Sequence, residues 1–284
     1  MPPRSLALLL LLAALWGGSF VFMRVAVPSL GPIPLAYVRV SLAAIALLIL
    51  AFAQRRVPPF RTRWREFAVV GVVNSALPFA LFSYGQLYVT AGTGAILNAT
   101  SPFFAAIAAA FWLGEALTAK KVTGMTLGIT GVVILVGWHP ESVSRDVALA
   151  LAACLVGAVC YALAGVYIKR KLTGVPSFAI ACASQVTAAI ALMPALPFTS
   201  VPGPLTGIVL ANVVALALAS TALAYLIYFK LIADAGPQRA LTVTFLIPLF
   251  GVLWGYVFLG EALTASMLAG GALVVAGTAL ALRS

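Results

Sequence analysis

The stretch LGEALTA occupies residues 113–119 and returns, letter for letter, at residues 259–265. The offset between the two copies is 259 − 113 = 146 positions. The same offset relates Pro102 to Pro248. Similarity at a fixed offset is the signature of an internal repeat. This short stretch therefore predicts that the chain contains two copies of one structural unit.

The composition is that of a membrane protein. The 284 residues are 63% hydrophobic and only 8% charged, whereas a soluble domain is about 25% charged. The net charge of +11 comes from basic residues at the ends of apolar runs, where they orient a protein in the bilayer. The expected surroundings are therefore a lipid bilayer, and no nucleic-acid partner is expected.

Apolar runs separated by charges or by Gly, Pro and Ser clusters predict ten spans, because a span needs about 20 apolar residues. Residues 1–138 would hold the first five and residues 146–284 the last five. Because five is odd, the second copy crosses the membrane in the opposite sense. The expected fold is an all-α membrane protein of ten transmembrane helices in two inverted five-helix repeats, forming one membrane domain. The predicted spans are 5–27, 33–53, 67–89, 93–113, 121–138, 147–168, 176–198, 205–232, 237–259 and 265–282.

The distribution of lysine and arginine predicts the orientation. The loop after the second span carries five arginines between positions 55 and 65, and such loops remain in the cytoplasm. This places every basic residue in the cytoplasm except Arg24, Arg39 and Arg145, with Arg24 and Arg39 expected close to the opposite face. Both termini are expected to be cytoplasmic, in a multi-pass protein of the inner (plasma) membrane.

Several motifs together resemble a known family. They are Trp-Gly-Gly-Ser-Phe at 16–20, a fourth span centred on Pro102 and ending in WLGEALT (112–118), and a ninth span ending in FLGEALT (258–264). With ten spans in two repeats, the chain resembles the drug/metabolite transporter superfamily, its EamA-type group, and within that group the YddG-type exporters of aromatic amino acids. The resemblance covers essentially the whole chain and implies export of small metabolites.

The acidic residues all lie at predicted helix ends or in loops, whereas proton coupling usually uses a carboxylate inside a span. Glu115 and Glu261 have two interpretations. In the favoured one, the glycine before each glutamate ends one helix, and the threonine three residues after the glutamate caps the next helix. The glutamate then lies near the positive N-terminal end of this next helix. The alternative is an ion or substrate carboxylate at a gate.

Three prolines are candidate hinges. Pro102 and Pro248 occupy equivalent positions in the fourth and ninth spans, and each removes a backbone donor and favours a kink. Pro78 in the third span has Ala224 as its counterpart, so that kink would be asymmetric. The alternative is that all three kinks are static.

The small-residue pairs Gly124–Gly128 and Gly251–Gly255 favour close helix contact. Packing within the chain is the favoured interpretation, and a dimer interface is the alternative. The protein is accordingly expected to be a monomer, with dimerisation left open.

A midplane cavity in an inverted repeat is lined by equivalent positions of both copies. On the third and eighth spans these positions hold hydroxyls and aromatic rings at a spacing of three to four. We expect a neutral, aromatic cavity with hydroxyl and amide groups, suited to a flat apolar side chain with a zwitterionic head group; packing or interfacial aromatics are the alternative. The candidate substrate-binding residues are Trp16, Ser19, Ser75, Phe79, Phe82, Ser83, Asn98, Tyr161, Thr221, Tyr225, Tyr228 and Thr244.

The expected function is export of amino acids, chiefly aromatic ones, and of related small neutral metabolites by alternating access, without a requirement for ion coupling. The alternatives are a broad-specificity drug or metabolite exporter with proton coupling, and a channel. A membrane-embedded enzyme is not expected, because such enzymes cluster ionisable or metal-binding groups at membrane depth and the chain has one histidine, His139. No metal or cofactor is expected.

Overall fold

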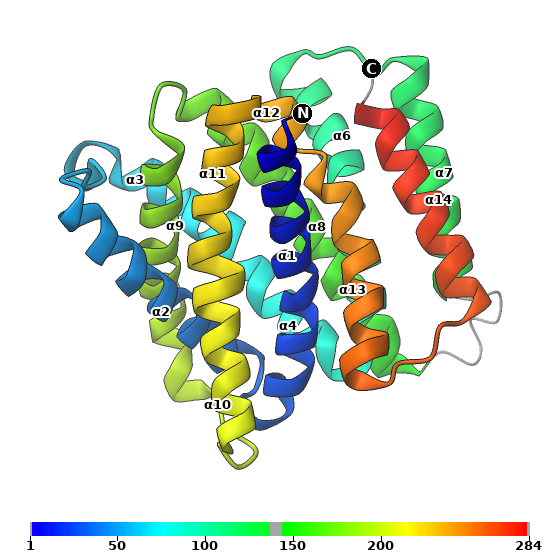
Figure 1. Ribbon diagram of the computed structural model, residues 1–284, viewed down its shortest axis with the longest axis horizontal. Helices are drawn as coiled ribbons and strands as arrows, with labels where there is room; N and C mark the ends of the chain where they lie inside the picture. Colours follow the sequence, from blue (N-terminus) through cyan, green and yellow to red (C-terminus); the bar gives the residue numbers. More distant parts are fainter. Residues whose placement is uncertain (1, 137–143, 283–284) are drawn as a thin grey trace.

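The computed structural model describes residues 2–136 and 144–282, and within these ranges every regular element is helical (Figure 1). His139 and the end of the fifth predicted span lie outside the described residues. The first copy contains α1 (Pro3–Leu30), α2 (Pro32–Ala53), α3 (Phe60–Gly71), η1 (Val72–Ala76), α4 (Leu77–Tyr88), α5 (Ala91–Asn98), α6 (Ser101–Leu113) and α7 (Ala119–Val136). The second contains α8 (Arg145–Lys171), α9 (Ser177–Leu192), η3 (Met193–Phe198), α10 (Gly207–Val214), η4 (Ala215–Leu223), α11 (Ala224–Ala235), α12 (Pro237–Ala240), α13 (Val243–Leu259) and α14 (Ala265–Leu282).

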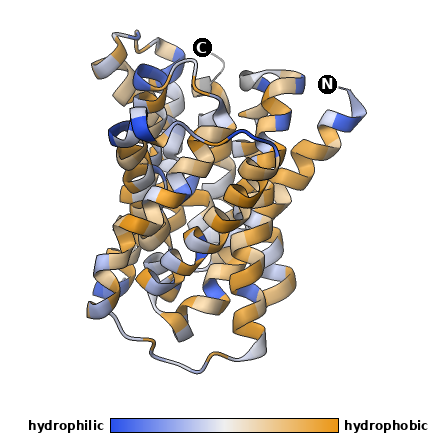
Figure 2. Cartoon of the chain, turned by 90° about the vertical axis from the view of Figure 1, so that its left-hand side faces the viewer, coloured by the Kyte–Doolittle hydropathy of each residue, from blue (hydrophilic) through white to orange (hydrophobic). Residues whose placement is uncertain are grey.

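These elements correspond to the ten predicted spans. In the described residues, eight helical segments are long and apolar enough to cross a membrane, and α13 and α14 are shorter apolar helices. Large apolar side chains face outward, among them Phe111 and Phe198, which are 85% and 89% exposed. Figure 2 shows hydrophobic residues along most of the helical surface. An apolar surface of this extent is that of a multi-pass membrane protein.

The two LGEALTA turns lie at opposite ends of the bundle (Figure 1). The turn after α6 lies at the end where both chain termini lie, and the turn after α13 lies at the other end. Gly114 and Gly260 end their helices in the left-handed region, with φ of 69° and 64°. That conformation favours glycine because it lacks a Cβ, so the predicted helix ends are confirmed.

The third and eighth spans each contain π-helix at their centre, which the sequence did not indicate. The segment η1 (72–76), shifted by 146, becomes 218–222 and falls inside η4 (215–223). In a π turn the backbone bonds reach one residue further than in an α-helix, and such turns are frequent at functional sites. The matched π segments place Ser75 and Thr221, which are equivalent residues, at the middle of the molecule.

The fourth and ninth spans are both interrupted, but at positions that do not correspond. The break between α5 and α6 lies at Ala99 and Thr100, just before Pro102. Pro102 lacks the N–H that would bond the carbonyl of Asn98, and the hydroxyl of Ser101 donates to that carbonyl instead, at 2.6 Å. Pro248, by contrast, lies inside α13.

The two interruptions are therefore not equivalent, and a kink at Pro248 inside α13 stays a prediction. The second break lies at Leu241 and Thr242, before α13. Pro78 lies in the first turn of α4, directly after η1. Movement at any of the three prolines stays a prediction.

Candidate functional site

A cavity of about 530 Å³ lies between the two copies. It reaches from the centre of the bundle to the end that carries the first LGEALTA turn, where Glu115, Lys121 and Lys169 line it. Its volume is in the range of pockets that hold small molecules. Both copies contribute to its wall, because α1, α4 and α6 of the first copy face α8, η4, α11 and α13 of the second.

Most of the sequence-predicted residues meet at this cavity. Ser75 and Ser83 do not line it; both are buried behind the wall, and Ser75 accepts a hydrogen bond from Gln185. Of the three candidate hinges, Pro102 lines the cavity. Contact of any of these residues with a cargo stays a prediction. The predicted residues on the wall are Trp16, Ser19, Phe79, Phe82, Asn98, Tyr161, Thr221, Tyr225, Tyr228 and Thr244.

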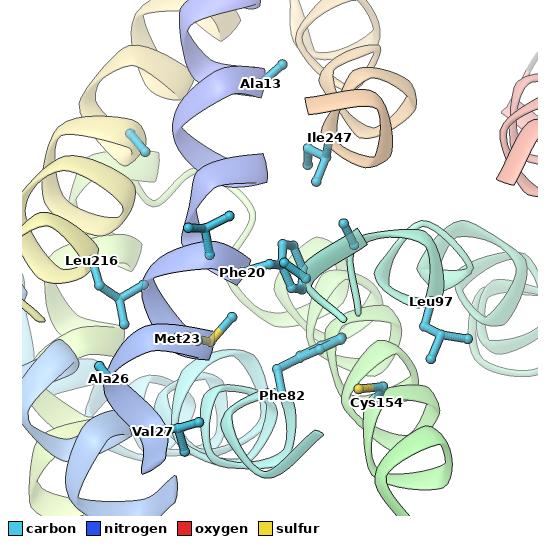
Figure 3. Packing of buried hydrophobic residues seen from close by; sticks show 14 of the residues in the cluster. Ala13, Phe20, Met23, Ala26, Val27, Phe82, Leu97, Cys154, Leu216 and Ile247 are labelled. Carbon is cyan, nitrogen blue, oxygen red and sulfur yellow. The ribbon is translucent and has the colours of Figure 1, made fainter. Parts of the chain in front are cut away.

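Aromatic rings form two groups on the wall. Trp16 of α1 contacts Tyr225 and Tyr228 of α11, with ring centroids 6.3 and 5.3 Å apart. Phe82 of α4 stacks on Tyr161 of α8 at 5.9 Å and meets Phe20 edge-on at 5.8 Å. Figure 3 shows Phe20 and Phe82 meeting in the core. Each group joins a helix of one copy to a helix of the other, and aromatic pairs at these distances prefer such tilted or offset geometry.

The hydroxyls of the wall face the cavity as acceptors. Ser19 donates to the carbonyl of Trp16 at 2.6 Å, and Thr244 donates to the carbonyl of Leu241 at 2.8 Å. Ser220 donates to a carbonyl of α1 at 2.6 Å. A hydroxyl whose hydrogen is used in this way has only lone pairs left. These positions therefore suit a hydrogen-bond donor on a ligand, such as an ammonium group.

The expectation of a neutral cavity is wrong, because Arg39 of α2 lines it. Arg39 is 6% exposed and lies seven residues after the start of α2, or about 10 Å along the helix axis. Its Nε donates to Thr221 Oγ1 at 2.9 Å, and its guanidinium carbon lies 3.6 Å from the centroid of the Phe79 ring. Among the described residues, no carboxylate forms an ion pair with it.

A signal for Arg39 was present in the sequence. It is the one charged residue of the segment 32–53, and a charge inside a span is a candidate functional residue by default. The positive-inside count instead assigned it to a membrane face. Asn74 was also missed; it lines the cavity and donates to the hydroxyl of Tyr225 at 3.4 Å.

The Arg39 hydrogen bond has a counterpart in the other copy. The offset of 146 carries Arg39 to Gln185 and Ser75 to Thr221. Arg39 Nε donates to Thr221 Oγ1 at 2.9 Å, and Gln185 Nε2 donates to Ser75 Oγ at 3.0 Å. In both cases the second span of one copy bonds to a π segment, η4 or η1. The two bonds are equivalent, but only one of the donors is charged.

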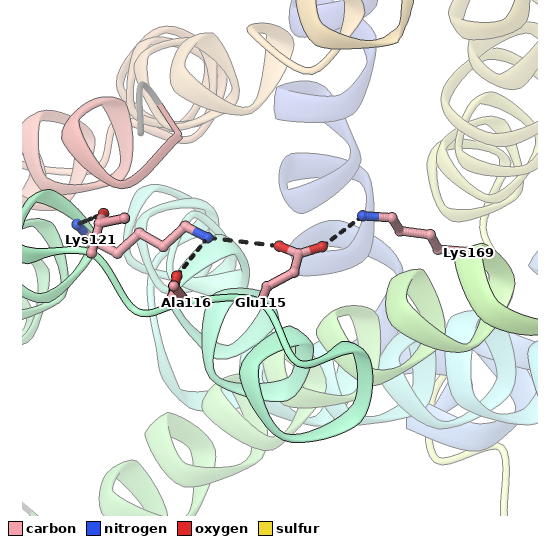
Figure 4. Close-up of polar contacts among 5 residues, drawn as sticks. Glu115, Ala116, Lys121 and Lys169 are labelled. Carbon is pink, nitrogen blue, oxygen red and sulfur yellow. Dashed lines mark hydrogen bonds and ion pairs between the residues drawn. The ribbon is translucent and has the colours of Figure 1, made fainter.

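At the open end, Glu115 bonds two lysines (Figure 4). Lys169 Nζ lies 2.6 Å from its carboxylate and Lys121 Nζ 3.6 Å. The pKa of the Glu115 carboxyl lies below its ordinary value, because Lys169 donates a hydrogen bond to it and the two positive charges favour the ionised form. Thr118 caps α7, as predicted, by accepting from the Lys121 amide at 3.3 Å.

At the closed end, Glu261 has different partners. Its carboxylate accepts from the backbone amides of Ala91 at 2.7 Å and Gly92 at 3.3 Å. It therefore caps α5 of the first copy, whereas α14, the helix that follows it, is capped by Thr264, which accepts from the Met267 amide at 3.1 Å. The favoured interpretation places each glutamate near the start of the helix that follows it. Glu115 does pair with Lys121 in the first turn of α7, whereas the hydrogen bonds of Glu261 go to α5 of the other copy.

The charged and sulfur-bearing residues give no sign of a metal centre. Within residues 2–136 and 144–282, no group of three or more His, Cys, Asp or Glu side chains is placed to hold a metal ion. The three cysteines, Cys154, Cys160 and Cys182, are buried free thiols. The deep part of the cavity carries arginine, hydroxyl, phenol and amide groups, and the carboxylate of Glu115 and the ammonium groups of Lys121 and Lys169 line its open end.

Comparison with known proteins gives the family. Residues 4–137 and 148–283 each match the model of the EamA-like transporter family. An uncharacterised transporter of Bacillus subtilis, YvbV, is 26% identical and covers 98% of this chain and 91% of its own. A solved crystal structure superposes with a TM-score of 0.66 at 18% identity over 99% of this chain and 97% of its own, which shows a shared fold.

Two relatives have names that state a cargo. A probable terminal-alkyne amino-acid exporter of Streptantibioticus cattleyicolor is 28% identical and covers 96% of this chain and 91% of its own. A probable amino-acid metabolite efflux pump of Salmonella typhimurium is 26% identical and covers 95% of this chain and 92% of its own. The chain belongs to the EamA-like transporter family, within the drug/metabolite transporter superfamily, and is a multi-pass membrane transporter rather than an enzyme.

Proposed function

We propose that this protein exports amino acids with aromatic side chains, and related small neutral metabolites, across the inner (plasma) membrane by alternating access. The observation that carries the proposal is the cavity between the two copies, which is walled by aromatic rings and open at one end. Trp16, Tyr225 and Tyr228 contact one another and form an aromatic part of the wall, against which a flat apolar side chain can pack, and the acceptor hydroxyls suit an ammonium group. The names of two relatives support the amino-acid class.

The orientation follows from the basic residues. Lys121 and Lys169 lie at the open end of the cavity, the same end as the termini, and clusters of lysine and arginine remain in the cytoplasm. On this assignment the described structure is open to the cytoplasm, and a cargo enters past Glu115. The two copies would then be inverted with respect to the bilayer, which gives a transporter two related states that open to opposite sides.

The two LGEALTA turns supply the contacts that would alternate. In this structure Glu261 caps the start of α5 and holds the far end closed. The offset of 146 carries Ala91 and Gly92 to positions 237 and 238, the start of α12. Position 237 is Pro237, which has no backbone N–H, so Glu115 has no counterpart of the bond that Ala91 donates to Glu261. When the cavity opens to the other side, Glu115 would leave its two lysines and accept from the amide of Gln238, the counterpart of Gly92.

The test is counterflow in proteoliposomes. Purified protein is reconstituted into vesicles loaded with unlabelled phenylalanine, and uptake of labelled phenylalanine from outside is followed. We expect saturable uptake that increases with the internal amino acid and does not change when a pH gradient is imposed or collapsed. Flux that follows the pH gradient would favour the proton-coupled drug and metabolite exporter. Flux that rises linearly without saturation would indicate a channel, and no counterflow of any amino acid would refute the proposal.

A further inference from the structure

Among the described residues, the buried cation Arg39 has no carboxylate as a counter-ion. It lies about two turns into α2 and is almost completely buried. No carboxylate of the described residues pairs with it. Removing a cation from water is costly unless it is paired or hydrogen-bonded, and inside a bilayer such residues mark the path of a substrate or an ion. Arg39 lines the cavity, so a carboxylate on a bound molecule could reach it from there.

The protein groups around Arg39 satisfy only part of it. A guanidinium carries five N–H donors in a planar fork. One, on Nε, reaches Thr221 Oγ1 at 2.9 Å, and Nη1 has only the thioether sulfur of Met23, at 3.7 Å, which is a weak acceptor. The Phe79 ring covers one face of the guanidinium at 3.6 Å. Among the described residues Nη2 has no hydrogen-bond partner. These contacts are all neutral and fix the plane of the fork.

The equivalent bond in the second copy shows which property of Arg39 is needed for helix packing and which is not. Gln185 links α9 to Ser75 of η1 just as Arg39 links α2 to Thr221 of η4. A neutral side chain is therefore sufficient to hold a second span against a π segment. The positive charge of Arg39 is not needed for that link, so it requires another explanation.

We propose that Arg39 binds the carboxylate of the cargo and makes a carboxylate a requirement for recognition. A planar guanidinium binds a carboxylate through two parallel hydrogen bonds, and the contacts with Phe79 and Thr221 fix the orientation of the Arg39 guanidinium. The cargo class is an aromatic molecule with a carboxylate, either an amino acid or an aryl carboxylic acid, and aromatic amines are rejected. This inference rests on the proposed function, because it takes the cavity as the site of the cargo.

The test measures binding of four aromatic probes that carry a carboxylate, an ammonium group or both. Phenylalanine and hydrocinnamate carry the carboxylate, whereas phenylalanine amide and phenethylamine lack it. Binding to the purified protein in detergent is measured by calorimetry. We expect the wild type to bind the two carboxylates at least about tenfold more tightly than the amide and the amine, which is what a hydrogen bond to a charged group supplies.

Arg39→Gln should weaken binding of both carboxylates by roughly ten- to hundredfold. It should not weaken binding of the amide or the amine, which carry a positive charge themselves. Arg39→Lys keeps the charge but loses the planar guanidinium, so its affinity for the carboxylates should lie between those of the wild type and Arg39→Gln. The matched control is Gln185→Met, which removes the equivalent helix-to-helix bond without removing a charge and should leave the ratio of carboxylate to amide affinity unchanged. Melting temperature and gel-filtration profile verify that each variant is folded.

The outcomes separate this inference from the proposed function. Equal binding of phenylalanine and its amide by the wild type, or an Arg39→Gln variant that alters all four affinities by one factor, overturns the role of Arg39. If Arg39→Gln does not fold, an unchanged ratio of carboxylate to amide affinity in Arg39→Lys overturns it as well. Arg39-dependent binding of hydrocinnamate by a protein that transports no amino acid supports the role of Arg39 and refutes the proposed function alone. A wild type that binds none of the four probes refutes both.

Discussion

At the scale of single residues, two identical heptapeptides give their glutamates different partners. Glu261 accepts backbone amides of α5, and Glu115 accepts from the side chains of Lys169 and Lys121. Lys169 is exposed and Glu115 is half-buried, and ion pairs that water reaches in this way contribute little to stability. The glycine that ends each helix could be predicted, because its left-handed conformation is a local requirement. The partners of each glutamate could not, because they come from other helices.

The Glu115 pair makes stability depend on pH in a defined direction. The pKa of Glu115 is lowered in the folded protein by the hydrogen bond from Lys169. Its contribution is therefore fully present above the pKa of the unfolded chain and is lost as pH falls through the lower, folded pKa. We expect Glu115→Gln to reduce the melting temperature slightly near neutral pH, with the difference disappearing in acid. Tryptophan fluorescence during heating measures it, and a difference that widens on acidification would contradict the assignment.

The direction in which the Arg39 side chain points could not be predicted from the sequence pattern. Its type and depth could be read from the segment 32–53, but its direction depends on how α2 packs against η4 and α4. Loop-charge counting treats every basic residue as a marker of a membrane face. A cation that faces the interior therefore receives the wrong assignment until the neighbouring helices are placed.

At the scale of helices, glycine pairs set how closely α7 and α14 approach. A Cβ on Gly124 would lie 2.5 Å from the carbonyl oxygen of Gly277, and a Cβ on Gly131 would lie 2.6 Å from that of Gly270. The offset of 146 positions carries Gly124 to Gly270 and Gly131 to Gly277, so these two contacts are equivalent to each other in the repeat. Small residues permit such backbone contact between membrane helices. The structure thus places Gly124, the first residue of its GxxxG pair, in contacts within the chain.

We expect Gly131→Val to destabilise the protein by about 1–3 kcal/mol, because the added side chain forces the two helices apart. Gly207 begins α10, and a Cβ there would meet nothing within 4 Å, so Gly207→Ala is the matched control and should have no cost. Unfolding in mixed micelles with a graded denaturing detergent compares the two. Equal stability of both variants would mean that the α7–α14 contact is looser than described.

The ten spans could be predicted from sequence because hydrophobic length is a property of each segment alone. The interruptions could not be predicted in the same way. Pro102 correctly marks a break in its span, yet its equivalent Pro248 remains inside α13. A π turn or a helix break persists only where neighbouring groups satisfy the freed carbonyls, as Ser101 does for Asn98.

At the scale of the whole molecule, one end of the cavity is closed by contacts between the copies. Glu261 bonds the start of α5 at this end, whereas Trp254 of α13 donates to the carbonyl of Ala14 in α1 at 3.0 Å nearer the middle of the bundle. Gly251 packs against Ala95. Two states that differ by a few such contacts are close in free energy, so one hydrogen-bonded pair can shift their populations. The existence of two copies could be predicted from the repeated heptapeptide, but which end is closed could not.

We expect Glu261→Gln to shift the population toward opening at this end. The neutral amide keeps the acceptor but loses the charge, which changes the balance by about 1 kcal/mol, or roughly fivefold. The readout is a cysteine at Val89, a buried position near α5, in a background in which the three native cysteines are replaced by alanine. A membrane-impermeant maleimide should react several-fold faster when Glu261 is replaced.

Glu66→Gln is the control for this experiment, because Glu66 pairs with Arg63 at 3.3 Å on a different helix and should leave the reaction rate unchanged. A rate that is the same with and without Glu261 would mean that the capping contact does not govern closure.

The unequal pair Arg39 and Gln185 has a consequence for how such a protein arises. In a dimer of two identical five-helix chains, every side chain at the interface occurs twice. A cation at the position of Arg39 would then recur at the position of Gln185, a fully buried site that is bonded to Ser75 and does not line the cavity, where a second unpaired charge would be costly. Joining the two units in one gene removes this constraint, because each half can change alone. A fused chain can carry a positive charge in one half and a neutral amide at the equivalent position of the other.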